Sequence, residues 1–109
     1  MATTFTVNFL WIPADLGGHS TEPWSGMRPQ IRWQRYVAEY LEGARDVQCS
    51  NVQFDPVTLR GRAHCCLSSP DPVPAEWLQD GELIELLSAH RVLAIGKIET
   101  LRAEGRSTT

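Results

Sequence analysis

Residues 15–31, DLGGHSTEPWSGMRPQI, are the most informative segment of this chain for its architecture. Together with Pro13 and Ala14 it is rich in Gly, Pro, Asp and Ser, which favour turns. It predicts a loop over residues 13–30, and this length is unusual for a compact domain. Long ordered loops often carry binding residues, so we expect a functional surface here.

Alternating patterns on both sides of the loop predict β-strands. Residues 3–12, TTFTVNFLWI, are rich in β-branched and aromatic side chains and alternate with period two. We expect one face of this strand to be buried, and it carries Phe5, Val7, Phe9 and Trp11. Pro13 ends the strand because proline has no backbone N–H to donate. Further strands are expected over 46–54 and 58–68, with a turn at Asp55-Pro56 between them.

Three other segments are less uniform. Residues 31–37 alternate, with Ile31 and Trp33 on one face, yet 33–42 also fits helical spacing. The three prolines in residues 68–74 exclude regular structure there. After a turn at Asp80-Gly81, residues 82–99 fit either a helix or a hairpin with its tip at 88–90.

The composition describes one soluble domain. The chain has 109 residues and a formal net charge of −3, which argues against a protein that binds a phosphate backbone. We expect one domain over 1–101 and a polar tail over 102–109. No apolar run is long enough for a membrane span, and the N-terminus lacks the features of a signal peptide. The three cysteines form a poor disulfide framework, so a reduced, cytoplasmic protein is expected.

The loop resembles a signature of the C-terminal β-barrel domain of translation elongation factor Tu. The shared pattern is Gly-Gly followed by Gly-x-Arg-Pro-Gln. The matching positions are Asp15, Gly17, Gly18, Thr21, Gly26, Arg28, Pro29 and Gln30, and Trp24 stands for the aromatic of the family's run. Near the end of the chain, residues 80–98 are similar to the family's final hairpin, where Arg91 and Gly96 hold their places.

The resemblance implies an all-β fold, a closed six-stranded antiparallel barrel, with residues 82–99 as two strands. It covers both ends of the chain, whereas residues 36–54 show no match. In the family this barrel follows a GTPase domain and a second barrel. The present chain has no Gly-x-x-x-x-Gly-Lys-Ser/Thr loop, so we expect no nucleotide binding by this chain alone.

The residues that we expect to bind a partner lie mainly in the loop, where the family makes contacts with neighbouring domains, the exchange partner and tRNA. Tryptophan is favoured in binding hot spots, although Trp24 and Trp77 fit equally well as plugs over a barrel end. For Arg28 the favoured interpretation is structural, with a buried guanidinium that ties loop carbonyls together, and partner binding is the other interpretation. The expected partner-binding residues are His19, Thr21, Glu22, Trp24, Arg28, Gln30, Trp77 and Arg91.

Other chemistry finds little support in the sequence. His64-Cys65-Cys66 lacks the spaced pairs of a zinc site, and no nucleophile motif is present, so we expect no metal, cofactor or enzymatic activity. Arg60 and Arg62 share a strand face and leave RNA or tRNA binding as the alternative. The sequence therefore predicts a non-catalytic protein-binding module with a translation-factor-like barrel.

Overall fold

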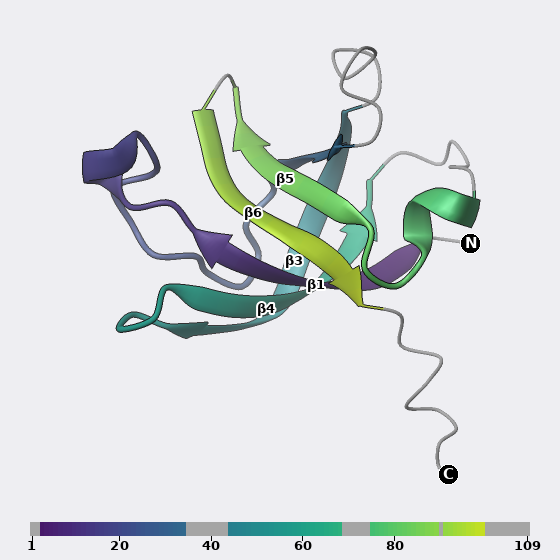
Figure 1. Cartoon of the computed structure of the whole chain (residues 1–109), viewed down its shortest axis with the longest axis horizontal. Coiled ribbons are helices and arrows are strands. Elements are labelled where there is room, and N and C mark those ends of the chain that lie inside the picture. Colours follow the sequence, from purple (N-terminus) through teal and green to yellow (C-terminus); the bar gives the residue numbers. More distant parts are fainter. Residues whose placement is uncertain (1–2, 35–43, 69–74, 90, 100–109) are drawn as a thin grey trace, which may run out of the picture.

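The computed structural model describes residues 3–34, 44–68, 75–89 and 91–99. Within these ranges the chain is all-β, with two short 3-10 turns, η1 (Ala14–Leu16) and η3 (Ala75–Leu78) (Figure 1). The strands are β1 (Thr4–Trp11), β2 (Gln30–Trp33), β3 (Arg45–Asp55), β4 (Arg60–Leu67), β5 (Leu83–Ser88) and β6 (Arg91–Glu99).

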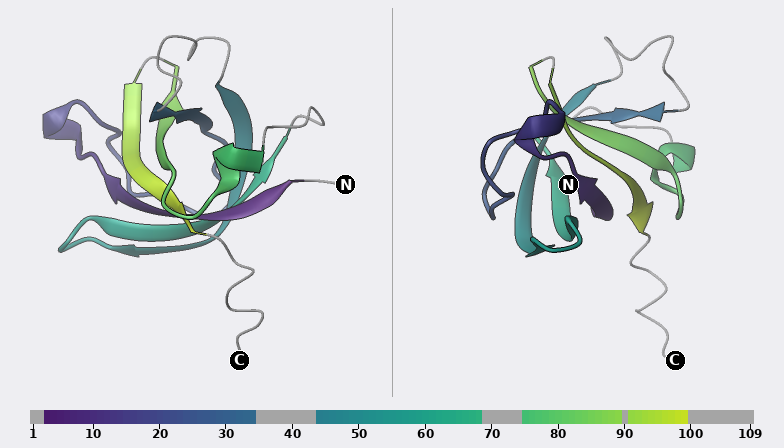
Figure 2. Two further views of the ribbon diagram at one scale, coloured as in Figure 1. Left: turned by 45° about the vertical axis from the view of Figure 1, so that its right-hand side comes forward. Right: turned by 60° about the vertical axis from the view of Figure 1, so that its left-hand side comes forward.

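The six strands form one antiparallel sheet in which every strand has two neighbours. The order β1-β4-β3-β2-β5-β6 returns to β1, which pairs with both β4 and β6. Figure 2 shows the strands curving around a common interior.

The interior is filled by the alternate residues that the pattern predicted. The buried face of β1 is confirmed, and Val7 and Ile31 are fully buried, as Trp33 nearly is. On β4 the alternation is equally regular, because Ala63, Cys65 and Leu67 are buried while the residues between them are not. On β1, β2 and β4 the apolar core residues therefore come from one face of the strand.

Residues 82–99 form the hairpin of β5 and β6, as the resemblance implied. Its register shifts between Leu86 and Leu87, and both of these side chains are buried. Ala89, which follows β5, lies in the left-handed region with a φ of 55°. The turns at Asp55-Pro56 and Asp80-Gly81 are also confirmed, the first held by the Val57 N–H donating to Asp55 Oδ1 at 2.9 Å.

Some expectations fall outside the described residues. These are most of the possible helix over 33–42, nearly all of the proline-rich stretch at 68–74, and the tail over 102–109. In the described part, β2 ends at Trp33.

Candidate functional site

The loop between β1 and β2 is fixed to the strands at both of its ends. At its start, η1 closes with Gly17 in the left-handed region (φ 95°), while Gly18 donates to the Pro13 carbonyl at 3.0 Å. Gly18 also lies against the Ile12 carbonyl, where a Cβ atom would collide. These two glycines shape the turn, and only Gly17 does so through positive φ.

At its other end the loop extends β2 along β3. Cys49 donates its N–H to the Met27 carbonyl at 2.9 Å and accepts from the Gly26 N–H at 2.6 Å, and Val47 donates to Pro29. Ser25 Oγ accepts from the Val52 N–H at 3.0 Å. The length of the loop is explained because its second half lies beside β3 as an irregular strand.

His19 and Trp24 come together at the surface of this loop. Their ring centroids are 5.9 Å apart, and Trp24 remains 48% exposed. His19 Nδ1 accepts from the Thr21 N–H at 3.1 Å, and the Thr21 carbonyl accepts from the buried Trp11 indole at 3.1 Å. The exposed Trp24 ring therefore sits on a hydrogen-bonded support that is connected to the core.

Arg91 and His19 line the same hollow. The hollow has a volume of about 870 Å³ and is bounded by η1 and the β5–β6 tip. Its lining residues are Ile12, Leu16, Gly17, His19, Ser88, Ala89, Arg91 and Val92. Arg91 donates to the Gly18 carbonyl at 3.5 Å, so the structure brings Arg91 and His19 to one site.

The other predicted binding residues do not line this hollow. Arg28 is exposed, so the expectation of a buried guanidinium that ties loop carbonyls is wrong; its Nη2 donates to Gln48 Oε1 at 3.5 Å. The loop carbonyls near it are instead bonded by backbone N–H groups of β3, which leaves the guanidinium free to reach solvent. Gln30 is exposed in β2, opposite Asp46, and Glu22 is exposed in the loop.

Trp77 packs into the fold. Its ring centroid lies 4.9 Å from that of Trp33, and its carbonyl accepts from the Trp33 indole at 2.6 Å. Trp77 is half-buried against the core, with the Arg45 guanidinium 5.9 Å from its ring centroid. The two loop tryptophans therefore differ, because Trp77 packs against the core while Trp24 is exposed at the surface.

The cysteines and histidines of the described residues do not form a metal centre. Cys65 points into the core and Cys66 to the other face of β4, as adjacent strand residues must. No cluster of three or more His, Cys, Asp or Glu side chains with metal-binding geometry occurs in the part of the chain that the structure describes. Cys49 and Cys65, however, meet in the interior with their sulfur atoms 3.8 Å apart, a pairing that the sequence reasoning missed.

Arg62, which the sequence placed on a basic strand face, is paired. Its Nε donates to Glu99 Oε1 at 3.0 Å, and Asn8 donates to the same oxygen at 2.9 Å. The hydrogen bonds from Asn8 and Arg62 lower the pKa of Glu99 below its ordinary value. The negative charge of Glu99 therefore lies next to Arg62 and weakens the attraction of Arg62 for phosphate.

Acid is expected to remove this ion pair. Because the pKa of Glu99 is lowered by folding, its stabilisation is complete above the unfolded-state value of about 4.3 and disappears as the pH falls through the folded-state value. The side chains of Arg62 and Glu99 are 46% and 37% exposed, so screening keeps the effect small. Thermal unfolding should show a slightly less stable Glu99→Gln variant at neutral pH that converges with the wild type in acid. A constant difference across the acid range contradicts this assignment.

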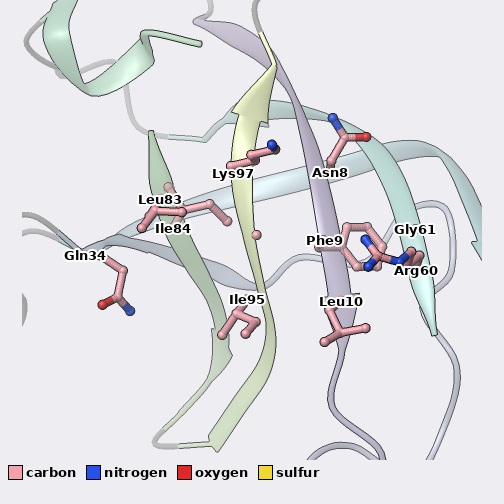
Figure 3. Close-up of a pocket in the computed structure, with 11 residues that line it drawn as sticks. Asn8, Phe9, Leu10, Gln34, Arg60, Gly61, Leu83, Ile84, Ile95 and Lys97 are labelled. Carbon is pink, nitrogen blue, oxygen red and sulfur yellow. The ribbon is translucent and has the colours of Figure 1, made fainter. Parts of the chain in front are cut away.

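A second concave surface lies on the outside of the sheet and was not predicted. This groove has a volume of about 680 Å³. Its lining side chains come from β5, β6, β1 and β4 and from Gln34 (Figure 3). Leu10, Leu83 and Ile95 line it and are 38%, 58% and 45% exposed. Leu10 and Ile95 are register partners. Only Leu10 could have been found from the sequence, because it is an apolar residue at an outward position of the alternating strand β1.

Two cations stand at the border of this groove. Arg60 and Lys97 both line it, and among the described residues no ion pair involves either side chain. The surface therefore combines apolar side chains with unneutralised positive charge.

Comparisons with known proteins assign this chain to no family. No family model matches the chain, and no curated protein matches it significantly. Among the described residues no helix is both long enough and apolar enough to cross a bilayer.

Proposed function

We propose that this chain is a non-catalytic protein-binding module built on a closed six-stranded barrel of the elongation factor Tu C-terminal type. The order of its antiparallel strands and the hairpin at 83–99 support the barrel part of the proposal. The loop signature from Gly17 to Gln30 and the place of Arg91 support the likeness to the family.

The observation that carries the binding proposal is the half-exposed Trp24 on its fixed support. A tryptophan at the surface loses little conformational entropy on binding when its ring is already held by neighbours. Here the ring lies against His19, and the loop beneath it is bonded to β3 and to Trp11. We define the loop face as His19, Thr21, Glu22, Trp24 and Arg91, and propose that it receives the partner.

The groove over Leu10, Leu83 and Ile95 is the competing surface for the same function. Its apolar side chains with Arg60 and Lys97 suit a segment that carries both apolar and acidic residues. The RNA-binding alternative has less support, because Arg62 is paired with Glu99.

Replacement of Trp24 by alanine tests whether the loop face binds the partner. Immobilised chain is used to capture proteins from cells that make it, and the captured proteins are quantified by mass spectrometry. Trp24→Ala is expected to reduce capture of the specific partner at least tenfold, since removal of a hot-spot tryptophan typically costs about 2 kcal/mol or more. The thermal unfolding midpoint should stay close to that of the wild type.

Two exposed apolar residues provide matched controls. Val57→Ala alters the 89% exposed residue of the β3–β4 turn and should leave capture unchanged. Leu83→Ala alters the groove, so loss of capture there, with Trp24→Ala unaffected, moves the binding surface to the groove. If neither Trp24→Ala nor Leu83→Ala changes the set of captured proteins, the protein-binding proposal is wrong. If ribonuclease abolishes capture, the RNA alternative is supported.

A further inference from the structure

Two thiols face each other across β3 and β4 in the interior. Cys49 and Cys65 are register partners, both are fully buried, and their Sγ atoms are 3.8 Å apart as free thiols. This contact brings together two residues that are sixteen positions apart in sequence, through the hairpin of β3 and β4.

The backbone bonds of Cys49 define what kind of pair this is. Its N–H and its carbonyl are both engaged by the loop, with Met27 and Gly26, on the side away from β4. Directly opposed residues in an antiparallel pair either exchange both backbone bonds or exchange neither. Cys49 and Cys65 thus form a non-hydrogen-bonded pair, in which Cα atoms lie about 4.5 Å apart and side chains approach most closely. That separation falls within the range of natural disulfides.

We propose that Cys49 and Cys65 are an oxidisable cross-strand dithiol, which a peroxide-class oxidant closes to a disulfide between β3 and β4. No change of strand register is needed, because the two residues are already opposed. The link would lie directly beneath the segment that anchors the loop, since Cys49 is the residue to which Gly26 and Met27 are bonded.

The chemistry balances with peroxide as the oxidant. One thiolate attacks hydrogen peroxide, so that an S–O bond forms, the O–O bond breaks and the departing hydroxide is protonated to water. The second thiol attacks the sulfenic sulfur, the S–S bond forms, and the S–O bond breaks to release a second water. The two sulfurs lose two electrons in total and the peroxide gains them.

The two sulfur atoms share one hydrogen bond in which either thiol can donate. This contact lowers the pKa of Cys49 and, together with burial, raises the pKa of Cys65. Both thiols are buried, so their oxidation depends on local opening and should be slower than that of the half-buried Cys66. Cys66 lies on the other face of β4 and cannot join the pair.

Peptide mapping of the oxidised protein tests the proposal. The full chain, first reduced, is incubated with hydrogen peroxide, denatured, alkylated and digested with trypsin. We expect the peptide with Cys49 to be linked to the peptide that starts after Arg62, with a mass lower by two hydrogens. Cys65 and Cys66 share that second peptide, so the Cys66→Ser variant assigns the link to Cys65.

Stability provides an independent readout. Closing the chain between residues 49 and 65 restricts the unfolded state, and the unfolding midpoint should rise by roughly 10 °C and return when a reductant is added. A chain that carries Cys65 alone, made by Cys49→Ala with Cys66→Ser, should show neither the link nor the rise.

Two results overturn the proposal. One is complete alkylation of Cys49 and Cys65 in denaturant after the same treatment has oxidised Cys66 in the wild type. The other is a link from Cys49 to Cys66, because this requires strands in a register different from the one described. A Cys49–Cys65 link without a rise in the midpoint retains the dithiol and overturns its stabilising role.

Discussion

Replacement of Gly96 by alanine is expected to lower the free energy of unfolding by about 3 kcal/mol or more, enough to unfold a marginal domain. Gly96 lies in β6 opposite Phe9 of β1. A Cβ atom on this residue would stand 2.2 Å from the Asn8 carbonyl oxygen and 2.8 Å from the Phe9 Cα atom. These are backbone atoms, so no side-chain rotation relieves the collision, and β1 and β6 must move apart.

The matched control is Gly81→Ala. Gly81 has a positive φ of 89°, but nothing lies within 4 Å of its added Cβ. We expect this variant to lose only about 1 kcal/mol, from backbone strain. Urea unfolding of both variants measures the contrast. Equal, small losses would mean that β1 and β6 are not held as closely at Gly96 as the structure shows.

The pairing at Gly96 belongs to the hairpin that local sequence left undecided between strand and helix. Leu86 and Leu87 are both buried on β5, and Leu93 and Ala94 are both buried on β6. This breaks the period-two pattern because the register shifts between Leu86 and Leu87. Consecutive buried residues at a bulge imitate helical spacing, so the strands could be recognised here only from the family resemblance. On β1, which has no such irregularity in its pairing, alternation alone predicted the buried face.

The candidate site was less accessible to sequence reasoning because it depends on contacts between distant segments. Trp24 and Trp77 both lie outside the strands, and only the fold shows that Trp77 meets Trp33 while Trp24 meets solvent. The Cys49–Cys65 contact depends on the register of β3 with β4, which shifts between Ser50 and Gln53. No count along the chain reveals such a shift. His19 of the loop and Arg91 of β6 were both predicted as binding residues, although the hollow that they share was not.

Trp33→Ala is expected to lower the free energy of unfolding by about 4 kcal/mol, close to the whole stability of many domains. Trp33 is 1% exposed, so its removal leaves a large cavity between β2 and the segment with Trp77. It also removes the indole N–H that donates to the Trp77 carbonyl at 2.6 Å. Urea unfolding followed by circular dichroism measures the loss without depending on tryptophan emission.

Two further variants separate the contributions and connect stability to binding. Trp33→Phe retains a buried ring and removes the indole donor, so its loss should be smaller, about 1–3 kcal/mol. Trp24→Ala deletes the same side chain from an exposed position and should cost about 0.5 kcal/mol or less. If Trp24→Ala destabilises as strongly as Trp33→Ala, then the loop tryptophan serves the core, and loss of capture by that variant would no longer indicate a binding surface. The Trp24 ring is assigned to partner binding only if the Trp24→Ala variant stays as stable as the wild type and no longer captures the partner.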